Sequence, residues 1–486
     1  MKIDDVVQKY EITIGIECHV QLKTATKLFS GASNDARDEQ PNTTVSPICF
    51  GFPGVLPVLN EEALTLAIRA GLALNATIPE RSRFERKHYF YPDLPKGYQI
   101  TQLAEPVIVG GHVDVPTGIG VTTKVRIHHA HLEEDAGKLT HPAGGTQSFV
   151  DLNRAGTPLI EIVSEPDIHT VAAARAYAQE LYLLMTYADV TYGDLYHGNM
   201  RFDVNLSLAH LGSDTLGTRT EIKNLNSFRS VEKAAEYEAI RQAKLLDEGE
   251  AIVQETRGWN EATFQTFSQR SKEDAHDYRY FPDADIPPVK IEQERVKAIA
   301  KTMPLLPADY RKKWQELELD ISVINSLLAS SSFASLVTDV LERSTKSHAV
   351  RVANWLVSSF HISPEADSNY GLNVLNVERM IELSTMVEDG QLSSTSAKAV
   401  LQGMFGTIDT PKVIAERLNL LQQSDENELA KIVDAVLAEP ASQKAIEDIR
   451  SGNDRAIGYL VGMVMKQSSG KANPGVVSKL VRDKIN

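Results

Sequence analysis

Side chains that could hold a metal ion first appear in the segment 12–22. Its even positions are apolar and most of its odd positions are polar, an alternation typical of a strand with one buried face. Glu17 and His19 therefore share the face opposite the apolar residues, and Cys18 is expected in the core. A carboxylate beside an imidazole could bind a divalent cation, although a solvated strand face would show the same pattern.

A denser group of candidate ligands follows in the segment 125–138. It holds three histidines and then three consecutive acids, namely His128, His129, His131, Glu133, Glu134 and Asp135. Six such groups in so short a stretch are unusual for an ordinary protein surface. One hypothesis is a metal-dependent hydrolase built on the three histidines, which would turn over its substrate without ATP.

A single carboxylate interrupts the next apolar strand. Glu161 lies inside the segment 159–163, whose other residues are aliphatic. An unpaired charge in such a strand would be costly. Glu161 therefore needs a partner, either a basic side chain or a cation.

The segments 202–208 and 220–226 repeat this arrangement. The first alternates and carries Asp203, and the second contributes Lys223 and Asn224. Hard divalent cations prefer oxygen ligands, and Mg²⁺ usually binds few carboxylates together with water and nucleotide phosphates. Four alternating strands with such residues predict a metal–nucleotide site. The competing explanation is a set of structural ion pairs.

Several motifs that define other enzymes are absent from the sequence. No GxxxxGK[S/T] stretch occurs, so ATP would not be held by a P-loop. No GxGxxG opens a helix after a strand, which disfavours a dinucleotide-binding domain. Neither a glycine- and serine-rich amidase stretch nor a cysteine in a nucleophile elbow is present. The chain is therefore not expected to release ammonia from an amide by itself.

The composition is that of a globular protein of several domains. At roughly 150 residues per domain, 486 residues predict two to four domains, and the net charge of −15 disfavours indiscriminate nucleic-acid binding. Cys18 and Cys49 are the only cysteines, which excludes a disulfide scaffold and a thiolate-based structural zinc site. The N-terminus resembles neither a signal nor a transit peptide. The longest apolar runs reach about half of the roughly 20 residues that span a bilayer, so we expect a cytoplasmic protein.

The two ends of the chain differ in their secondary-structure signals. Before the prolines of segment 286–288, frequent turn residues predict short strands and loops. After them, helical periodicity predicts helices over 291–303 and 349–360. From Arg450 onward seven Lys or Arg accompany two Asp. This reversal of charge indicates either a solvated basic helix or an end that contacts RNA phosphates.

Recognisable stretches follow one another along nearly the whole chain. They are Gly15–Leu22, Gly54–Asn60, Tyr89–Gln99, Glu133–Lys138, Asp151–Asp167, Lys223–Phe228, His276–Pro282, Gly458–Gly462 and Ala472–Pro474. In this order they resemble the B subunits of the aspartyl/glutamyl-tRNA amidotransferase family. The last two stretches are similar to the YqeY-like tail of that family.

The resemblance implies an α+β fold in three parts. Residues 1–292 would form a catalytic cradle domain on an antiparallel sheet, related to the glutamine synthetase fold. Residues 293–405 would form an all-α helical domain. Residues 406–486 would form a small α-helical, YqeY-like domain that binds tRNA.

The resemblance also implies a reaction and partners. The amidase, or A, subunit would liberate ammonia from glutamine, and the small C subunit would brace the pair. With ATP and Mg²⁺, the B subunit would phosphorylate the side-chain carboxylate of glutamate misacylated on tRNA(Gln), or of aspartate on tRNA(Asn). Ammonia would then displace phosphate to give the amide. The activation is needed because a carboxylate oxygen is a poor leaving group.

The motif match assigns roles to individual residues. The metal ligands would be His19, Glu134 and Glu161, with Glu17, Glu133 and Asp203 as a second set. Phosphate contacts would come from Arg154 and Lys223, with Asn224 orienting them. The expected catalytic residues are thus Glu134, Glu161, Lys223 and Arg154, and the candidates for the acceptor-end pocket are Tyr89, Tyr91 and Tyr98. Because histidine is an unusual ligand for Mg²⁺, Mn²⁺ is also a candidate ion.

Two stretches depart from the family pattern. Many members carry two cysteine pairs near the start that bind zinc, whereas this chain keeps only Cys49 of the four, so no zinc is expected. The segment 192–203 lacks the usual acidic, glycine-containing sequence, although Asp203 matches. A non-enzymatic alternative is a tRNA-docking scaffold whose acids are structural and which would not hydrolyse nucleotide.

Overall fold

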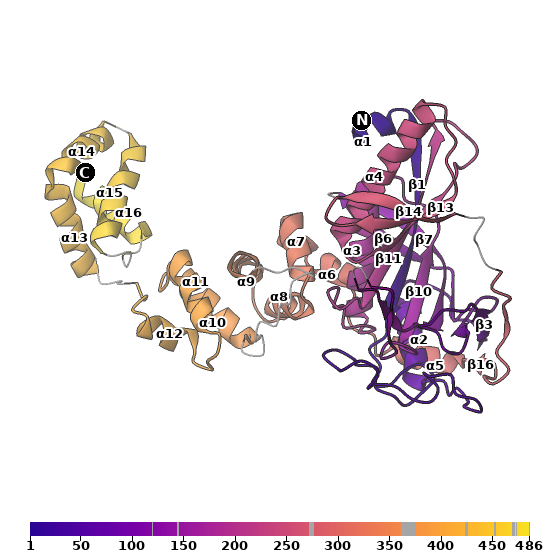
Figure 1. The fold of residues 1–486 in the computed structure, drawn as a ribbon. Coiled ribbons are helices and arrows are strands. Elements are labelled where there is room, and N and C mark those ends of the chain that lie inside the picture. The colour runs from indigo at the N-terminus through magenta and orange to yellow at the C-terminus, as the bar shows by residue number, and fades with distance from the viewer. Residues whose placement is uncertain are drawn as a thin grey trace. The chain divides into compact units, whose positions relative to one another are not determined.

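The computed structural model divides the chain into two compact units, Met1–Asp309 and Tyr310–Asn486 (Figure 1). The structure describes residues 1–118, 120–142, 145–271, 277–360, 375–422, 426–451, 453–468, 472 and 474–485. Of the stretches that carry the family resemblance, His276 and Asn473 lie outside these described residues.

The first unit is built on a nine-stranded sheet of order β14-β13-β12-β11-β1-β10-β7-β5, with β6 paired to β7. Neighbouring strands are antiparallel except for β12 and β13. The bounds are β1 Tyr10–Gln21, β5 Ile108–Val109, β6 His112–Gly118, β7 Val121–Glu134, β10 Pro158–Ser164, β11 Met200–His210, β12 Thr220–Leu225, β13 Glu255–Asn260 and β14 Gln265–Ser271. The expected α+β class with a mainly antiparallel sheet is thereby confirmed.

Strand β1 lies between β10 and β11 and shows the predicted alternation. Ile14, Ile16 and Cys18 are fully buried, whereas Glu17 and His19 are only partly buried. Cys18 is therefore a core thiol, as the sequence predicts. The sheet has one apolar face that packs into the core and one polar face that carries the candidate site residues.

Helices α3 (Val171–Tyr187) and α4 (Phe228–Asp247) pack on each other and against strands of the sheet (Figure 1). Each begins at a side chain that caps its free amides. The hydroxyl of Thr170 accepts from the Ala173 amide, and that of Ser227 accepts from the Ser230 amide. Apolar residues along both helices are buried, so the helices hold the apolar face of the sheet in place.

Short elements complete the first unit. A three-stranded sheet contains β15, β3 and β4, and two-stranded sheets join β16 to β2 and β8 to β9. Their bounds are α1 Ile3–Val7, α2 Glu61–Ala73, β2 Arg81–Ser82, β3 Glu85–His88, β4 Tyr98–Thr101, β8 Lys138–Thr140, β9 Phe149–Asp151, β15 Phe281–Pro282, β16 Val289–Lys290 and α5 Gln293–Ala300. Strand β4 contacts β7, which brings β3 and β4 next to the candidate site.

The second unit is helical in the residues that the structure describes. Its helices are α7 Ile321–Leu328, α8 Ser331–Arg343, α9 Lys346–Ser359, α10 Val377–Glu388, α11 Ser394–Gly403, α12 Pro411–Arg417, α13 Glu426–Ala438, α14 Gln443–Arg450, α15 Ile457–Gln467 and α16 Pro474–Ile485. Helix α6 (Pro307–Lys313) begins in the first unit and ends in the second. The predicted helices over 291–303 and 349–360 correspond to α5 and α9. Helices α13 to α16 share a core that includes Val433, Leu460, Val464 and Val481.

A search of the described ranges for membrane spans finds no single helix of sufficient length and apolarity. The bent pair α7 and α8 meets those two criteria when the helices are taken together.

Candidate active site

The pairing register brings candidate residues from separate strands to one place on the polar face. His19 of β1 lies opposite Glu161 of β10, and Glu161 in turn lies opposite His131 of β7. On the other side of β1, Glu17 lies opposite Asp203 of β11. Side chains at directly opposed positions of antiparallel strands are close neighbours. Residues more than a hundred positions apart in sequence therefore meet.

Three of these side chains could hold a metal ion together, and we call His19, Glu133 and Glu161 the cation cluster. The Nε2 atom of His19 lies 3.6 Å from Oε1 of Glu133 and 3.5 Å from Oε2 of Glu161. Their candidate ligand atoms all lie within 4.8 Å of one another. Two carboxylates and one imidazole fit a hard or borderline divalent ion such as Mg²⁺ or Mn²⁺.

His131 provides positive charge beside the two carboxylates of the cation cluster. Its Nε2 atom lies 3.3 Å from Oε2 of Glu161 and 3.6 Å from Oε2 of Glu133. Burial on its own lowers the pKa of His131, but hydrogen bonds to the two carboxylates outweigh it and raise this pKa to about 10. Burial likewise raises the pKa of Glu133 and Glu161, yet the contact with His131 leaves both below their usual range. At neutral pH an imidazolium therefore lies between two carboxylates.

The other two histidines of β7 extend from His131 in a row. The Nε2 atom of His129 lies 3.2 Å from Nδ1 of His131, and Nδ1 of His128 lies 2.7 Å from Nδ1 of His129. Burial and the two neighbouring imidazoles lower the pKa of His129 to about 4. Among the described residues, neither His128 nor His129 belongs to a group that could hold a metal ion. The geometry therefore gives no support to a hydrolase centred on three histidines.

A second carboxylate group, Glu17, Asp203 and Glu221, lies on the same face, and we call it the acidic cluster. The ammonium of Lys223 lies 2.7 Å from Oε1 of Glu221 and 3.1 Å from Oδ2 of Asp203. Burial lowers the pKa of Lys223, but the two acids outweigh it and raise this pKa above its ordinary value. Burial and Glu161 raise the pKa of Glu17. Lys223 thus neutralises part of the acidic cluster.

Asn224 fixes one carboxylate of the acidic cluster through its backbone. Its φ of 62° lies in the left-handed region, which asparagine tolerates better than most residues. In this conformation the Asn224 amide donates to Oδ1 of Asp203 at 2.8 Å. The side chain of Asn224 is exposed.

Glu134, which the motif match pairs with His19 and Glu161, is not brought to them. It is buried, forms an ion pair with Lys96, and accepts a hydrogen bond from the Ile100 amide at 3.0 Å. Successive residues of a strand point to opposite faces, so Glu133 and Glu134 cannot both join the cation cluster. Alternate residues of a strand share one face, so the sequence itself indicates that Glu133 lies on the same face as His131.

Arg154 also lies outside both clusters. Its guanidinium donates to the carbonyls of Ala136 at 3.0 Å and Gly137 at 2.7 Å, and lies 3.3 Å from Asp135. Asp135 also accepts from Arg201 at 2.9 Å, and Arg201 is opposite His19 in the β1–β11 register. Asp135 thus links Arg154, in the loop before β10, to Arg201, which lies on β11 next to His19.

Three charged residues near the site were not selected from the sequence. Glu221 alternates with Lys223 on β12, so the strand pattern did contain a signal for it. Lys87 lies on β3, and its pKa is raised because Glu133 and Glu161 outweigh the effect of burial. Arg201 is recognisable only from the pairing of β11 with β1. The positions of Lys87 and Arg201 depend on long-range pairing that no local motif reveals.

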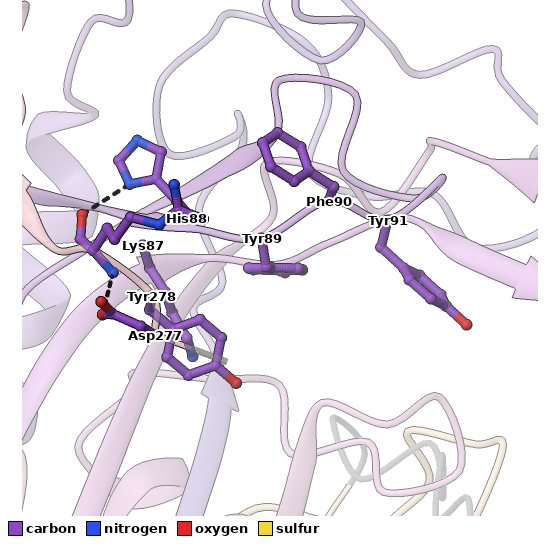
Figure 2. Close-up of a pocket in the computed structure, with 8 residues that line it drawn as sticks. Lys87, His88, Tyr89, Phe90, Tyr91, Asp277 and Tyr278 are labelled. Atoms are coloured by element: carbon purple, nitrogen blue, oxygen red, sulfur yellow. Dashed lines mark hydrogen bonds between the residues drawn. The ribbon is translucent and has the colours of Figure 1, made fainter. Parts of the chain in front are cut away.

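A cavity of about 580 Å³, which we call the aromatic cavity, lies beside Lys87. Tyr89, Phe90, Tyr91 and Tyr278 line it, and Figure 2 shows their rings spread along its wall. The rings of Tyr89 and Tyr278 meet edge to face at 6.3 Å, and Phe90 is 83% exposed.

Tyr98, the third tyrosine proposed for the acceptor end, does not line the aromatic cavity. The guanidinium of Arg86 lies 4.3 Å from its ring centroid. The geometry therefore places Tyr98 in packing contacts, while Tyr89 and Tyr91 do line the cavity.

Cys49 lies next to a buried ammonium. Its Sγ atom is 3.4 Å from Nζ of Lys27, which also donates to the Ala155 carbonyl at 2.7 Å. Ser46 contacts the same sulfur at 3.4 Å. Among the described residues, the sulfur of Cys49 therefore contacts one ammonium and one hydroxyl.

Known proteins resemble this chain over nearly its whole length. A family model described as the GatB/GatE catalytic domain matches residues 12–297, and one described as the GatB domain matches residues 336–485. Relatives named as B subunits of the aspartyl/glutamyl-tRNA(Asn/Gln) amidotransferase include one from Persephonella marina, 44% identical over 98% of this chain and 99% of its own. Another from Brevibacillus brevis is 42% identical over 99% of this chain and 100% of its own. The resemblance seen in the motifs is confirmed, and the chain belongs to the family of aspartyl/glutamyl-tRNA(Asn/Gln) amidotransferase B subunits.

Proposed function

We propose that this chain is the B subunit of a glutamine-dependent tRNA amidotransferase, a carbon–nitrogen ligase. It transfers the γ-phosphoryl group of ATP to the side-chain carboxylate of glutamate on tRNA(Gln) or aspartate on tRNA(Asn), and ADP leaves. Ammonia then attacks the acyl phosphate, and phosphate leaves as the amide forms. The products, Gln-tRNA(Gln) and Asn-tRNA(Asn), serve translation.

For a chain of this family, one observation carries this proposal. The cation cluster forms on a sheet face beside the aromatic cavity, whose volume of about 580 Å³ suits a terminal nucleotide. His19, Glu133 and Glu161 would hold Mg²⁺ or Mn²⁺. When bound, the ion would neutralise charge on the phosphates and on the acyl carboxylate. The carboxylates would supply the negative charge for it, and His19 would supply an imidazole nitrogen.

Other residues on the polar face would handle the phosphates. Lys223 offers an ammonium whose raised pKa keeps it charged through the neutral range, and Asn224 holds Asp203 in place beside it. Arg154, which lies outside both clusters and pairs with Asp135, would contact phosphate from the loop before β10. We propose that Glu134 acts indirectly, since its ion pair with Lys96 and its bond to Ile100 fix β4 against β7.

The aromatic cavity is our candidate for the acceptor end of tRNA. Unstacked bases at RNA ends bind by stacking on aromatic side chains. Tyr89, Phe90 and Tyr91 follow one another in sequence and all line the cavity. Lys87 lies in the same wall and interacts electrostatically with Glu133 and Glu161. A terminal nucleotide in this cavity would present its aminoacyl group to the cation cluster.

The wider assembly is part of the same proposal. The amidase A subunit would supply ammonia, and the small C subunit would brace the complex. Within this chain we propose a glutamine synthetase-like cradle over residues 1–292, a helical domain over 293–405 and a tRNA-binding tail over 406–486. Because tRNA is used for translation in the cytoplasm, we place the reaction there.

The first test removes one carboxylate of the cation cluster. In Glu161→Gln we expect the affinity for Mn²⁺ to fall about tenfold or more, because direct ligands matter at least as much as their outer-shell partners. ADP formation in the complex, stimulated by misacylated tRNA, should be lost while the amidase still hydrolyses glutamine. Titration calorimetry and an ADP assay measure these effects.

Glu134→Gln is the matched control for this test, because its carboxylate faces Lys96 instead of the cation cluster. Its Mn²⁺ affinity should stay within about twofold of the unmodified protein. Unchanged Mn²⁺ affinity in Glu161→Gln would remove the cluster from the mechanism. A wild-type complex that forms no ADP with misacylated tRNA would favour the tRNA-docking scaffold.

The second test uses the proton on His131. Because the pKa of His131 is about 10, its imidazolium opposes a divalent ion at neutral pH, and binding should expel the proton. Glu133 and Glu161, with lowered pKa values, are already ionised and release none. We therefore expect Mn²⁺ affinity to rise as pH increases from 7 towards 10. Calorimetry in two buffers of different ionisation enthalpy counts the proton released.

His131→Asn is the comparison variant, since it keeps a polar group without the titrating imidazole. Its Mn²⁺ affinity should change little with pH over this interval, and buffer-dependent heat should disappear. Proton release that persists in His131→Asn would show that another group titrates.

The third test concerns the basic tail. Truncation at Arg450 would remove α15 and α16 from the core that they share with α13 and α14, so point substitutions are preferable. In the double variant Lys466→Gln/Lys479→Gln, both exposed, two phosphate contacts would be lost. We expect weaker tRNA binding and a plot of log affinity against log salt that is shallower by about one to two.

Lys290→Gln serves as the control for the tail, because Lys290 is an exposed lysine of the first unit. It should leave both the affinity for tRNA and its salt dependence unchanged. An equal effect of the control and the tail variant would refute a specific role for the tail.

A further inference from the structure

Lys27 and Cys49 form a buried pair that has no role in the reaction as proposed so far, and we call them the amine–thiol pair. Lys27 is 1% exposed and Cys49 is 6% exposed. Nζ of Lys27 lies 3.4 Å from Sγ of Cys49, and Cys49 is a free thiol. A titratable amine and a thiol therefore touch inside the first unit.

The buried ammonium of Lys27 is short of negative charge. Within the part of the chain that the structure describes, its polar contacts are the Ala155 carbonyl at 2.7 Å, the Leu152 carbonyl at 3.4 Å and the sulfur of Cys49. None of these is a carboxylate. Because an uncompensated buried charge is costly, the thiolate form of Cys49 is the contact that can best balance the ammonium.

The surroundings also favour a reaction between the two groups. Burial lowers the pKa of Lys27, and Cys49 offsets this only in part, so the nucleophilic amine forms more readily. Burial raises the pKa of Cys49, but the Ser46 hydroxyl and Lys27 outweigh it and leave this pKa below its ordinary value. The thiolate is the form that an oxidant attacks. Cys18 differs, because burial raises its pKa well above the usual range.

A small cavity of about 10 Å³ lies against the amine–thiol pair. Such a volume holds about one molecule of the size of water. Hydrogen peroxide is only slightly larger than water, so the sulfur can meet a small peroxide more easily than a bulky disulfide. Lys96 also lines this cavity but is ion-paired with Glu134. Lys27 is therefore the amine placed to react with the sulfur.

The amine–thiol pair is tied to the loop before β10. Lys27 donates to the Ala155 carbonyl at 2.7 Å, and the Leu28 amide donates to the Gly156 carbonyl at 2.9 Å. Arg154, our candidate for a phosphate contact, lies in the same loop. A chemical change at the Lys27 nitrogen therefore reaches the loop that carries Arg154.

We propose that Lys27 and Cys49 are a site of oxidative crosslinking, at which a peroxide converts the contact into an N–S bond. The Cys49 thiolate attacks one peroxide oxygen, the O–O bond breaks, and the hydroxide that leaves takes a proton from the Lys27 ammonium and becomes water. The Lys27 amine then attacks the sulfur of the sulfenic acid. The S–O bond breaks, and a second water leaves with one proton of the amine. The sulfur gives up two electrons, and they reduce the peroxide to water.

The effect of the crosslink on activity rests on the proposed function and deepens it, whereas the crosslink itself does not depend on that reaction. The N–S bond removes the charge of Lys27 and all but one of its N–H donors. The contact with the Ala155 carbonyl is weakened as a result. We therefore expect oxidation to disturb the loop of Arg154 and to weaken the binding of ATP.

The test exposes the complete amidotransferase complex to hydrogen peroxide and maps its peptides by mass spectrometry. We expect a linked peptide that joins Lys27 to Cys49 and is lighter than the two separate peptides by two hydrogen atoms. A thiol reductant should release it. Cys18, which is fully buried, should stay a free thiol.

The same treatment is followed by kinetics. In the wild-type complex the KM for ATP should rise about fivefold on oxidation, which is the low end of typical coupling between two sites, and should return on reduction. Glutamine hydrolysis by the amidase subunit should not change, which controls for general oxidative damage.

Two variants separate the crosslink from other oxidation. Lys27→Arg keeps the positive charge but offers a poor nucleophile, so Cys49 should oxidise without forming a linked peptide. Cys49→Ser should form no linked peptide, and its KM for ATP should not respond to peroxide.

Three results would count against the inference. Cys49 that stays a free thiol in peroxide, or that becomes a sulfinic acid with no linked peptide, would overturn it. A linked peptide between Cys49 and Lys96 would overturn the assignment to Lys27. A Lys27–Cys49 peptide with an unchanged KM for ATP would overturn the effect on activity. By contrast, a reduced wild-type complex that forms no ADP would refute the proposed function, while the linked peptide would still confirm the crosslink.

Discussion

Two carboxylates, Glu133 and Glu161, meet on neighbouring strands in a partly buried site, and their mutual repulsion must be balanced by positive charge. The balance in this structure comes from His131, at 3.3 Å and 3.6 Å from the two side chains. Removing one partner from such a buried group leaves an uncompensated charge, which is strongly destabilising. The same arrangement creates a place where a divalent ion can replace the imidazolium proton. The interactions that stabilise the site without a metal ion therefore also leave it able to bind one.

The sheet makes this arrangement possible. Strand β1 places Ile16 and Cys18 in the core and His19 on the polar face, so burial of the apolar residues sets which side chains face the site. A slip of one residue in register would turn His19 inwards and expose the core residues. Packing under α3 and α4 and the geometry of the cation cluster are therefore coupled. The charged groups can be concentrated on one face because the opposite face supplies the stability.

Much of this organisation was predictable from the sequence. Period-two alternation identified Cys18 as a core residue and Glu17 and His19 as neighbours on a face, and the buried setting of Glu161 indicated a charged partner. The motif match grouped Glu134 with His19 and Glu161, whereas the structure groups Glu133 with them, because a motif aligns residues without stating which way each side chain points. The alternation of side chains along β7 distinguishes the two, because only Glu133 shares a face with His131. Lys87 and Arg201 were not predictable because they reach the site through β3 and through the β1–β11 pairing. Such long-range contacts have no local signature.

The most direct test of the account is electron–nuclear double resonance on the protein loaded with Mn²⁺. We predict one bound ion with a nitrogen coupling from His19 that is lost in His19→Gln and kept in His129→Gln. This measurement reports the ligand itself and does not depend on activity. Bound Mn²⁺ without a nitrogen coupling, or a coupling that survives in His19→Gln, would contradict the central claim that this imidazole and the two carboxylates form one cation site.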